Sequence, residues 1–478
     1  MSGCGDLRLG SESKTGNSVR ATRTIAAMTA VALVLGTPGA AWAESISGAL
    51  ARAYANNPDL NQQRAAVRAT DENMPRATSG YRPRVSASAD AGFLNNDTKI
   101  PGFGSQNSQT NPRGYGVSIT QNLWNGNRTI NGVRQAESSI LLARETLRNT
   151  EQTVLQNGAT SYMNVLRDTA ILNLRRNNIT VLEEQLRQTK DRFNVGEVTR
   201  TDVAQAESSL ATARSDFFVA QSNLQNSIAS FRQVIGVEPK KLEAARPIEN
   251  LLPRTLDQAI SNAFVEHPLV QAALHNVDVA AANVKMVEGE LLPTVGVTGA
   301  VNKRFDPSGS TQNYQTLSAS VVGSISVPLY EGGETYARVR QAKELVGQAR
   351  LQADLQRDAV RATVVSSWGA LQTAKAVIQS AQAAVNAAEI ALNGVREEAK
   401  VGQRTTLDVL NAQQVLLNTR VSLVTAQRDR VVASYLVMAA TGRLSSSHLK
   451  LQVANYNPTV HFDQVKDKWI GLRTPDGR

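Results

Sequence analysis

The chain has 478 residues, and its 51 lysines and arginines outnumber its 41 aspartates and glutamates, which gives a formal net charge of +10. The basic residues are spread among acidic ones, with no cluster of basic and aromatic side chains, which argues against a nucleic-acid partner. The single cysteine, Cys4, lies in an N-terminal part that we expect to be removed, so neither disulfides nor thiol chemistry are expected.

The first 43 residues have the features of a secretory signal peptide. Arg20 and Arg23 precede an apolar run over 25–35, and Ala41-Trp42-Ala43 is a small-x-small cleavage site. The apolar run is too short to span a bilayer, which disfavours the alternative of a retained anchor. We therefore expect an exported chain that begins at Glu44. No later run is apolar enough for a membrane helix, so any membrane insertion would use strands.

The remaining chain contains the same pattern twice. Asn57-Pro58 aligns with His267-Pro268 at an offset of 210 residues, and Leu123-Trp124-Asn125-Gly126 aligns with Leu329-Tyr330-Glu331-Gly332 at an offset of 206. Internal repetition of this kind predicts two equivalent structural units. We assign the first repeat to 44–254, the second to 255–444, and a C-terminal equatorial segment to 445–478.

Each repeat is expected to open with one helix, over 46–79 and 256–290, that ends before a proline. Two strands follow in each repeat, in which apolar residues alternate with small polar ones. The apolar positions are Val85, Ala87, Ala89, Ala91 and Phe93; Tyr115, Val117, Ile119 and Leu123; Val295, Val297 and Val301; and Leu317, Ala319, Val321, Ile325, Val327 and Leu329. The segments 95–114 and 304–316 are rich in Gly, Asn, Ser and Pro and are expected to be exposed loops.

Strands with one apolar face and one small polar face suit the wall of a membrane β-barrel, and a soluble sandwich is the alternative. Four strands cannot close a barrel alone, because the smallest outer-membrane barrels have about eight. The pattern therefore predicts that several copies share one barrel. At four strands a copy, two copies would supply eight strands and three copies twelve.

Two proline-free stretches, 127–193 and 333–399, predict helices of 67 residues, or about 100 Å each. Leu371, Ile378, Val385 and Leu392 recur every seven residues with an alanine-rich series beside them, which indicates a coiled coil. A turn and a return helix, over 201–235 and 407–440, are expected after each long helix. The opening and return helices together match one long helix in length, so they are expected to stack end to end beside it.

These residues resemble the TolC family of bacterial outer-membrane export channels over about 45–472. The most specific pieces are Arg192-Phe193-Asn194-Val195-Gly196 with Thr201-Asp202-Val203, and Val401-Gly402-Gln403-Arg404-Thr405 with Leu407-Asp408-Val409-Leu410. The resemblance implies a mostly α fold with a small β part. A long antiparallel coiled-coil helical barrel would continue from four strands per protomer in a shared 12-stranded transmembrane β-barrel.

The resemblance also implies a function. A homotrimer would be the passive exit duct of a tripartite efflux pump or type I secretion system, in contact with outer-membrane lipid. A periplasmic adaptor and an inner-membrane transporter of the ABC or RND type would dock at its closed tip. The pattern does not distinguish drugs or other small molecules from proteins as cargo.

The site residues are carried over from the same motifs. Asp202 and Arg404 would be partners in a lock that holds the tip shut, although the family's tyrosine in this network is Ala399 here. Asp408 aligns with a ring of acids that narrows the tunnel and favours cations, and the second ring falls at Asn411. The alternatives are capping acids for Asp202 and Asp408 and a solvent-facing turn residue for Arg404.

The adaptor is expected to contact the two turns. These carry Val195 and Gly196 in the first repeat and Val401 and Gly402 in the second.

No catalytic, cofactor or metal constellation is visible in the sequence. His267 and His275 are eight residues apart without a carboxylate at ligand spacing, and no phosphate loop or nucleophile elbow is present. We therefore expect no enzyme, and a periplasmic hydrolase has no support. The alternative to a channel is a secreted coiled-coil structural or adhesive protein with a small soluble sheet domain.

Overall fold

The computed structural model describes residues 44–102, 104–305 and 314–477. The expected signal peptide and Cys4 lie outside the described residues. None of the helices in the described part of the chain is both long and apolar enough to cross a membrane.

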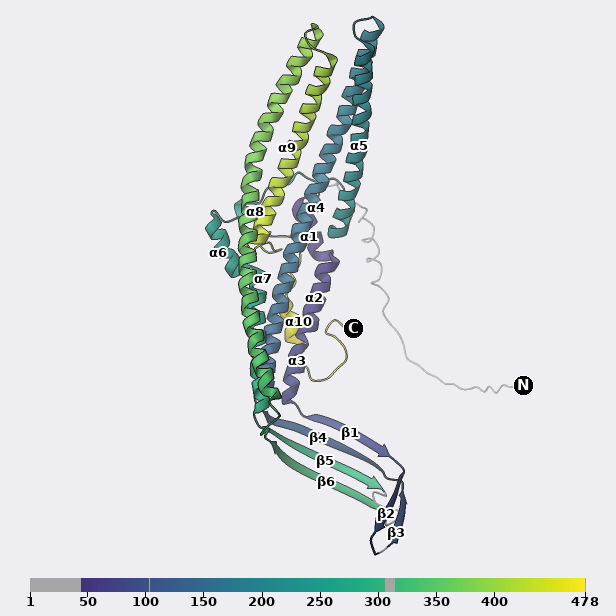
Figure 1. Ribbon diagram of the computed structural model, residues 1–478, viewed down its shortest axis with the longest axis vertical. Helices are drawn as coiled ribbons and strands as arrows, with labels where there is room; N and C mark the ends of the chain where they lie inside the picture. The colour runs from purple at the N-terminus through teal and green to yellow at the C-terminus, as the bar shows by residue number, and fades with distance from the viewer. Residues whose placement is uncertain (1–43, 103, 306–313, 478) are drawn as a thin grey trace, which may run out of the picture. The chain divides into compact units, whose positions relative to one another are not determined.

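Most elements of the two repeats match and follow in the same order, although in the described residues the first repeat has three more (Figure 1). The first contains α1 (Ile46–Asn56), α2 (Pro58–Asp71), α3 (Asn73–Thr78), β1 (Arg84–Ala91), β2 (Leu94–Ile100), β3 (Gly104–Thr110), β4 (Arg113–Asn125), α4 (Arg128–Asn194) and α5 (Arg200–Ile235). The second contains α6 (Leu256–Glu266), α7 (Pro268–Glu288), β5 (Thr294–Phe305), β6 (Gln315–Ser326), α8 (Glu334–Lys400) and α9 (Thr406–Ala440), and α10 (Pro458–Val465) follows. Short 3-10 turns occupy Ser79–Tyr81, Glu249–Leu251 and Gly289–Leu291.

The opening helix of each repeat is broken where one unbroken helix was predicted. Proline lacks the amide hydrogen that a helix interior needs, and it moves the preceding residue out of the helical region. Asn57 therefore ends α1 and caps α2, with its Oδ1 accepting from the Asp59 and Leu60 amides at 2.9 and 3.3 Å. His267 does the same between α6 and α7, where its Nδ1 accepts from the Leu269 amide at 3.2 Å.

We predict that replacing His267 with asparagine, the residue at the equivalent position 57, reduces the acid sensitivity of the protein. Burial, with a contribution from Arg148, lowers the pKa of His267 to about 4. A histidine in the unfolded chain has a pKa of about 6.5, so on acidification the unfolded chain takes up this proton before the folded chain does. The buried neutral ring therefore contributes its full free energy of stabilisation only above about pH 6.5. That stability is lost as the pH falls from about 6.5 to about 4, and amounts to about 3 kcal/mol.

Unfolding midpoints recorded from neutral to acidic pH would measure this effect. His267→Asn should flatten the profile, whereas His448→Asn, at an exposed histidine, should leave it unchanged. An acid profile of His267→Asn identical to that of the unmodified chain would contradict the prediction.

Four strands form one antiparallel sheet in the order β1-β4-β5-β6. The register places Val117 opposite Ala87 on one side and Val301 on the other, and Val301 lies opposite Ala319. Within the paired strands the predicted apolar positions therefore share one face of the sheet, except Leu123, which lies at a bulge that places Trp124 opposite Val295. Phe93, Val327 and Leu329 lie beyond the ends of β1 and β6. On the other face, Ser86 and Ser118 join their hydroxyls at 2.8 Å.

Both faces of this sheet are exposed. Nearly every residue of β1 and β6 is open to solvent, and Val321 of β6 is 80% exposed. The four strands therefore do not fold over an interior of their own, which contradicts the soluble-sandwich alternative. In the sheet as described, β1 and β6 each have one edge without a strand partner.

The prediction of a loop over 95–114 is wrong for most of that range. Strands β2 and β3 form a hairpin there, from the pair Leu94 and Thr110 to the pair Ile100 and Gly104. The turn uses Gly102 and Gly104 at φ of 91° and 86°, values that favour glycine. The hairpin has polar residues on both faces, so its sequence lacks the alternation that identified the other strands. The prediction of a loop over 304–316 is wrong at both ends, because β5 continues to Phe305 and β6 begins at Gln315. Residues 306–313 of that range lie outside the described residues.

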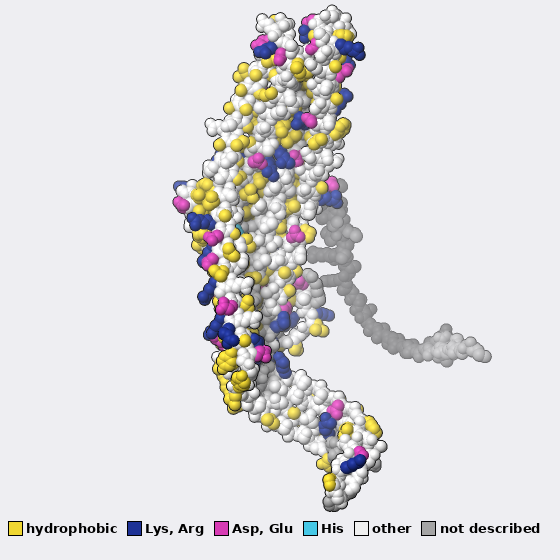
Figure 2. All heavy atoms as spheres, viewed as in Figure 1, with side chains coloured by type: hydrophobic (Ala, Val, Ile, Leu, Met, Phe, Trp, Pro, Cys, Tyr) yellow, Lys and Arg dark blue, Asp and Glu magenta, His cyan; other side chains and the backbone are white. Residues whose placement is uncertain are grey.

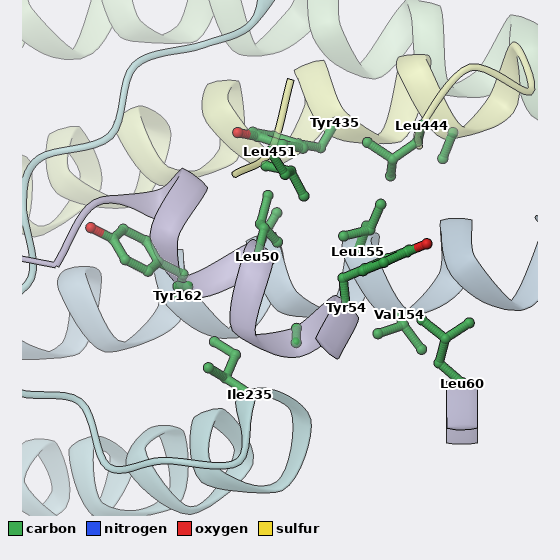
Figure 3. Packing of buried hydrophobic residues seen from close by; sticks show 14 of the residues in the cluster. Leu50, Tyr54, Leu60, Val154, Leu155, Tyr162, Ile235, Tyr435, Leu444 and Leu451 are labelled. Atoms are coloured by element: carbon green, nitrogen blue, oxygen red, sulfur yellow. The ribbon is translucent and has the colours of Figure 1, made fainter. Parts of the chain in front are cut away.

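The short helices pack along the long ones as their lengths predict. In the first repeat α1, α2, α3 and α5 all contact α4, and in the second repeat α6, α7 and α9 contact α8. Contacts of α4 with α7 and α9 join the repeats. The largest core cluster lies where α1 meets α4 and the segment after α9. Figure 3 shows Leu50, Tyr54 and Leu155 directed toward Leu444 and Leu451.

Candidate functional site

The two turns between the long and return helices have the same backbone structure. Gly196 and Gly402 adopt φ of 77° and 81°, in the left-handed region that ends many helices. The amide of Glu197 donates to the carbonyl of Arg192, and the amide of Gln403 donates to that of Glu398, each at 2.9 Å. The candidate site is therefore built twice in each chain, once at each turn (Figure 1).

A reciprocal capping box begins each return helix. Asp202 Oδ2 accepts from the amide of Thr199 at 2.9 Å and from its hydroxyl at 2.7 Å, and the Asp202 amide donates to the same hydroxyl. Asp408 and Thr405 repeat this arrangement at 3.0 and 2.9 Å. The hydrogen bonds from Thr199 lower the pKa of Asp202, and those from Thr405 lower the pKa of Asp408. Both acids therefore cap the N-termini of the return helices, which is the alternative that the sequence analysis gave for them. Both are charged at neutral pH.

Arg404 has a partner that the sequence did not indicate. Its Nε donates to Glu398 Oε2 at 2.8 Å, across the turn from the end of α8. The first turn has an analogous pair, in which Arg192 Nη2 donates to Glu197 Oε1 at 2.6 Å. Asp202 and Arg404 thus each bond within their own turn, and the structure of one chain does not join them. The spacing of Glu398 from Arg404, one on each side of the turn glycine, is the signal that would have identified this pair.

Both turns expose apolar side chains at their ends. Val195 is 78% exposed and Val401 is 72% exposed. Gly196 and Gly402 have open space where a side chain would project. The space-filling view shows charged side chains gathered just below these turns (Figure 2). Each turn therefore combines an apolar point with charged groups, which suits contact with another protein.

Among the described residues, no group of three or more His, Cys, Asp or Glu side chains is placed to hold a metal ion.

A sheet with one apolar and one polar face, continued by paired long helices with exposed turns, defines a membrane channel subunit with a helical extension. The family model described as "Outer membrane efflux protein" matches residues 49–237 and 259–443, one match in each repeat. The chain belongs to this family. The predicted resemblance and the two-fold repetition are confirmed.

The relatives agree with this assignment over most of their length. The chain is 41% identical over 439 residues to the outer membrane efflux protein BepC of Brucella suis, covering 92% of this chain and 94% of BepC. It is 26% identical over 434 residues to the outer membrane protein TolC of Escherichia coli, covering 85% and 84%. The outer-membrane channel CmeC of Campylobacter jejuni shares the fold, with a TM-score of 0.75 at 17% identity, covering 88% of this chain and 89% of CmeC. These comparisons give no support to a secreted structural or adhesive protein.

Proposed function

We propose that three copies of this chain form one channel that exports substrates across the outer membrane. The observation that carries the proposal is the four-stranded sheet, which is exposed on both faces and open at both edges. Pairing β1 of one copy with β6 of the next would satisfy these edges and close a barrel. Eight strands from two copies would make a barrel filled by side chains, whereas twelve from three copies leave a water-filled lumen.

The helices would continue this lumen into the periplasm. Each copy supplies α4, α8 and two stacks of shorter helices, so three copies supply a wall of twelve helical strands. The two turns of each copy would form the far end of the tunnel. An adaptor would contact Val195 and Gly196 in one turn and Val401 and Gly402 in the other, because the two valines are exposed and the two glycines have open space beside them.

The duct would be passive. The transporter, of the ABC or RND type, would supply the energy, and the channel needs no catalytic group. The alkaline protease secretion protein AprF of Pseudomonas aeruginosa is 27% identical over 331 residues, whereas BepC at 41% is named for efflux. The greater similarity to BepC favours efflux over protein secretion.

Closure of the tip would depend on contacts between copies. Asp202 and Arg404 both lie at the turns, where neighbouring copies would meet. If Arg404 of one copy released Glu398 and bound Asp202 of the next copy, this ion pair would lock the tip. Asp408 would add one ring of three carboxylates. With Asn411 at the position of the second ring, we expect weaker cation binding than two acidic rings would give.

Conductance in planar bilayers tests the proposal. The unmodified chain should give discrete, small conductance steps, and the double variant Asp202→Ala with Arg404→Ala should give larger ones because the tip is no longer held shut. Arg420→Ala is a matched control, since Arg420 pairs with Glu389 at 2.7 Å along the helices away from the turns. A purified oligomer that never conducts, even with both lock residues replaced, would refute a channel.

A further inference from the structure

The chain after α10 exposes three large apolar side chains close together. Trp469 is 67% exposed, Ile470 is 89% exposed and Leu472 is fully exposed. Large apolar side chains scattered singly are common on protein surfaces, but a contiguous group usually marks a contact with a partner or a membrane. The core of the described chain does not cover this group, so its side chains are available to a partner or a membrane surface.

Arg82 fixes the position of this group. Its Nη1 donates to the carbonyl of Lys468 at 2.7 Å, and its guanidinium lies over the Trp469 ring with 4.6 Å to the centroid. Arg82 is two residues before the start of β1 at Arg84. The group is therefore held at the end of the sheet where the strands meet the helices.

Other aromatic side chains mark the same end of the sheet. Trp124 pairs with Val295 at the helix-proximal end of the ladder between β4 and β5. Tyr330, just after β6, is 82% exposed. Tryptophan and tyrosine concentrate at membrane–water interfaces because their rings are apolar and their N–H or O–H groups are polar. Trp469 thus lies near the level where the apolar face of the sheet ends.

The charges around the group are mainly positive. Residues 466–473 contain Lys466, Lys468 and Arg473 against one acid, Asp467, and Arg82 and Arg84 lie at the adjoining start of β1. Lys466 is paired with Asp463 at 2.9 Å, so Lys468 and Arg473 are the cations beside the group. The Lys468 ammonium donates to the carbonyl of Arg473 at 2.6 Å, which holds the two cationic residues beside the apolar side chains. Cations next to exposed aromatic and aliphatic side chains favour the surface of an anionic membrane.

We propose that residues 468–473 bind the periplasmic surface of the outer membrane. Trp469, Ile470 and Leu472 would enter the headgroup region, and Lys468 and Arg473 would contact anionic phospholipid headgroups. This inference rests on the proposed function, in which the sheet crosses the membrane and the helices lie in the periplasm. The positive charge beside the apolar side chains, and their position near the level of Trp124 and Tyr330, select lipid over a neighbouring copy as the occupant.

Site-specific fluorescence tests the inference in assembled protein. The chain after residue 43 has no cysteine, so Ile470→Cys can be labelled alone with a polarity-sensitive nitrobenzoxadiazole dye. The protein is reconstituted in vesicles of phosphatidylethanolamine and phosphatidylglycerol that carry a lipid spin-labelled near the headgroup. The dye at position 470 should be quenched several-fold more strongly than one introduced by Ile390→Cys, a comparably exposed position on α8 at 75%.

Two further variants separate the possible results. Val321→Cys on β6, measured in vesicles that carry a lipid spin-labelled along its acyl chain, reports on the sheet: if its dye is not quenched, the proposed function and this inference both fall. If position 321 is quenched and position 470 is not, only the inference is overturned, whether water or a second copy surrounds the dye. The pair Lys468→Gln and Arg473→Gln should reduce quenching at 470 to the level measured in phosphatidylcholine vesicles. Unchanged quenching would overturn the role of anionic headgroups.

Discussion

Gly126→Ala is expected to prevent the channel from assembling. Gly126 lies between β4 and α4 with φ of 65°, and a side chain there would place its Cβ 2.1 Å from the carbonyl oxygen of Gly289. A Cβ on Gly289 would in turn lie 2.3 Å from the carbonyl oxygen of Gly126. The backbones of the two repeats therefore touch at the junction of sheet and helices. The left-handed conformation and the clash together should cost about 2–5 kcal/mol.

Gly236, at the end of α5, provides a matched control. It adopts φ of 89°, yet the nearest atom to an added Cβ is the Asn56 Cβ at 3.9 Å, an ordinary contact distance. Gly236→Ala should therefore cost only the conformational strain of about 1–2 kcal/mol. The yield of heat-modifiable oligomer in the outer membrane and its thermal midpoint would measure both variants. Equal losses for the two would show that contact between the repeats is unimportant.

The helices were predictable because their signals are local. The predicted range 127–193 agrees with Arg128–Asn194 to within one residue at each end. Glycine turns and a long run without proline define the ends of a helix whatever it packs against. The break at Asn57-Pro58 had an equally local signal, which was used only to align the repeats. The hairpin between Leu94 and Thr110 was missed because side chains that are polar on both faces leave no periodic pattern.

The candidate site divides in the same way. The caps formed by Asp202 and Asp408 follow from a spacing of three residues, so they were visible as alternatives. The bond of Arg404 to Glu398 was missed because it depends on how the turn folds back. A lock between copies depends on how the copies assemble, and no sequence pattern within one chain shows which residues of two copies would meet. The position of Trp469 depends on its contact with Arg82, which is hundreds of residues earlier in the sequence.

Asp408→Asn is expected to remove most of the cation preference of the channel while leaving its fold intact. An asparagine keeps a carbonyl oxygen that can accept from the Thr405 amide and hydroxyl, now at 3.0 and 2.9 Å. The helix would lose only its interaction with a negative charge at its N-terminus, about 0.3–1 kcal/mol. Those hydrogen bonds lower the pKa of the Asp408 carboxyl, so three copies would otherwise place three negative charges in a narrow tunnel. Carboxylates confined in this way favour cations.

Asp202→Asn separates selectivity from capping. Asp202 forms the same box with Thr199 in the first repeat, so its replacement removes the same charge from an equivalent helix end. The reversal potential in a potassium chloride gradient should fall toward zero for Asp408→Asn. Asp202→Asn removes a proposed lock partner, so it should raise the conductance but shift the reversal potential much less, because the three Asp408 carboxylates remain. The two variants should have similar thermal midpoints. Equal shifts of the reversal potential would mean that selectivity arises from the overall charge of the tips, and that Asp408 has no special place in the tunnel.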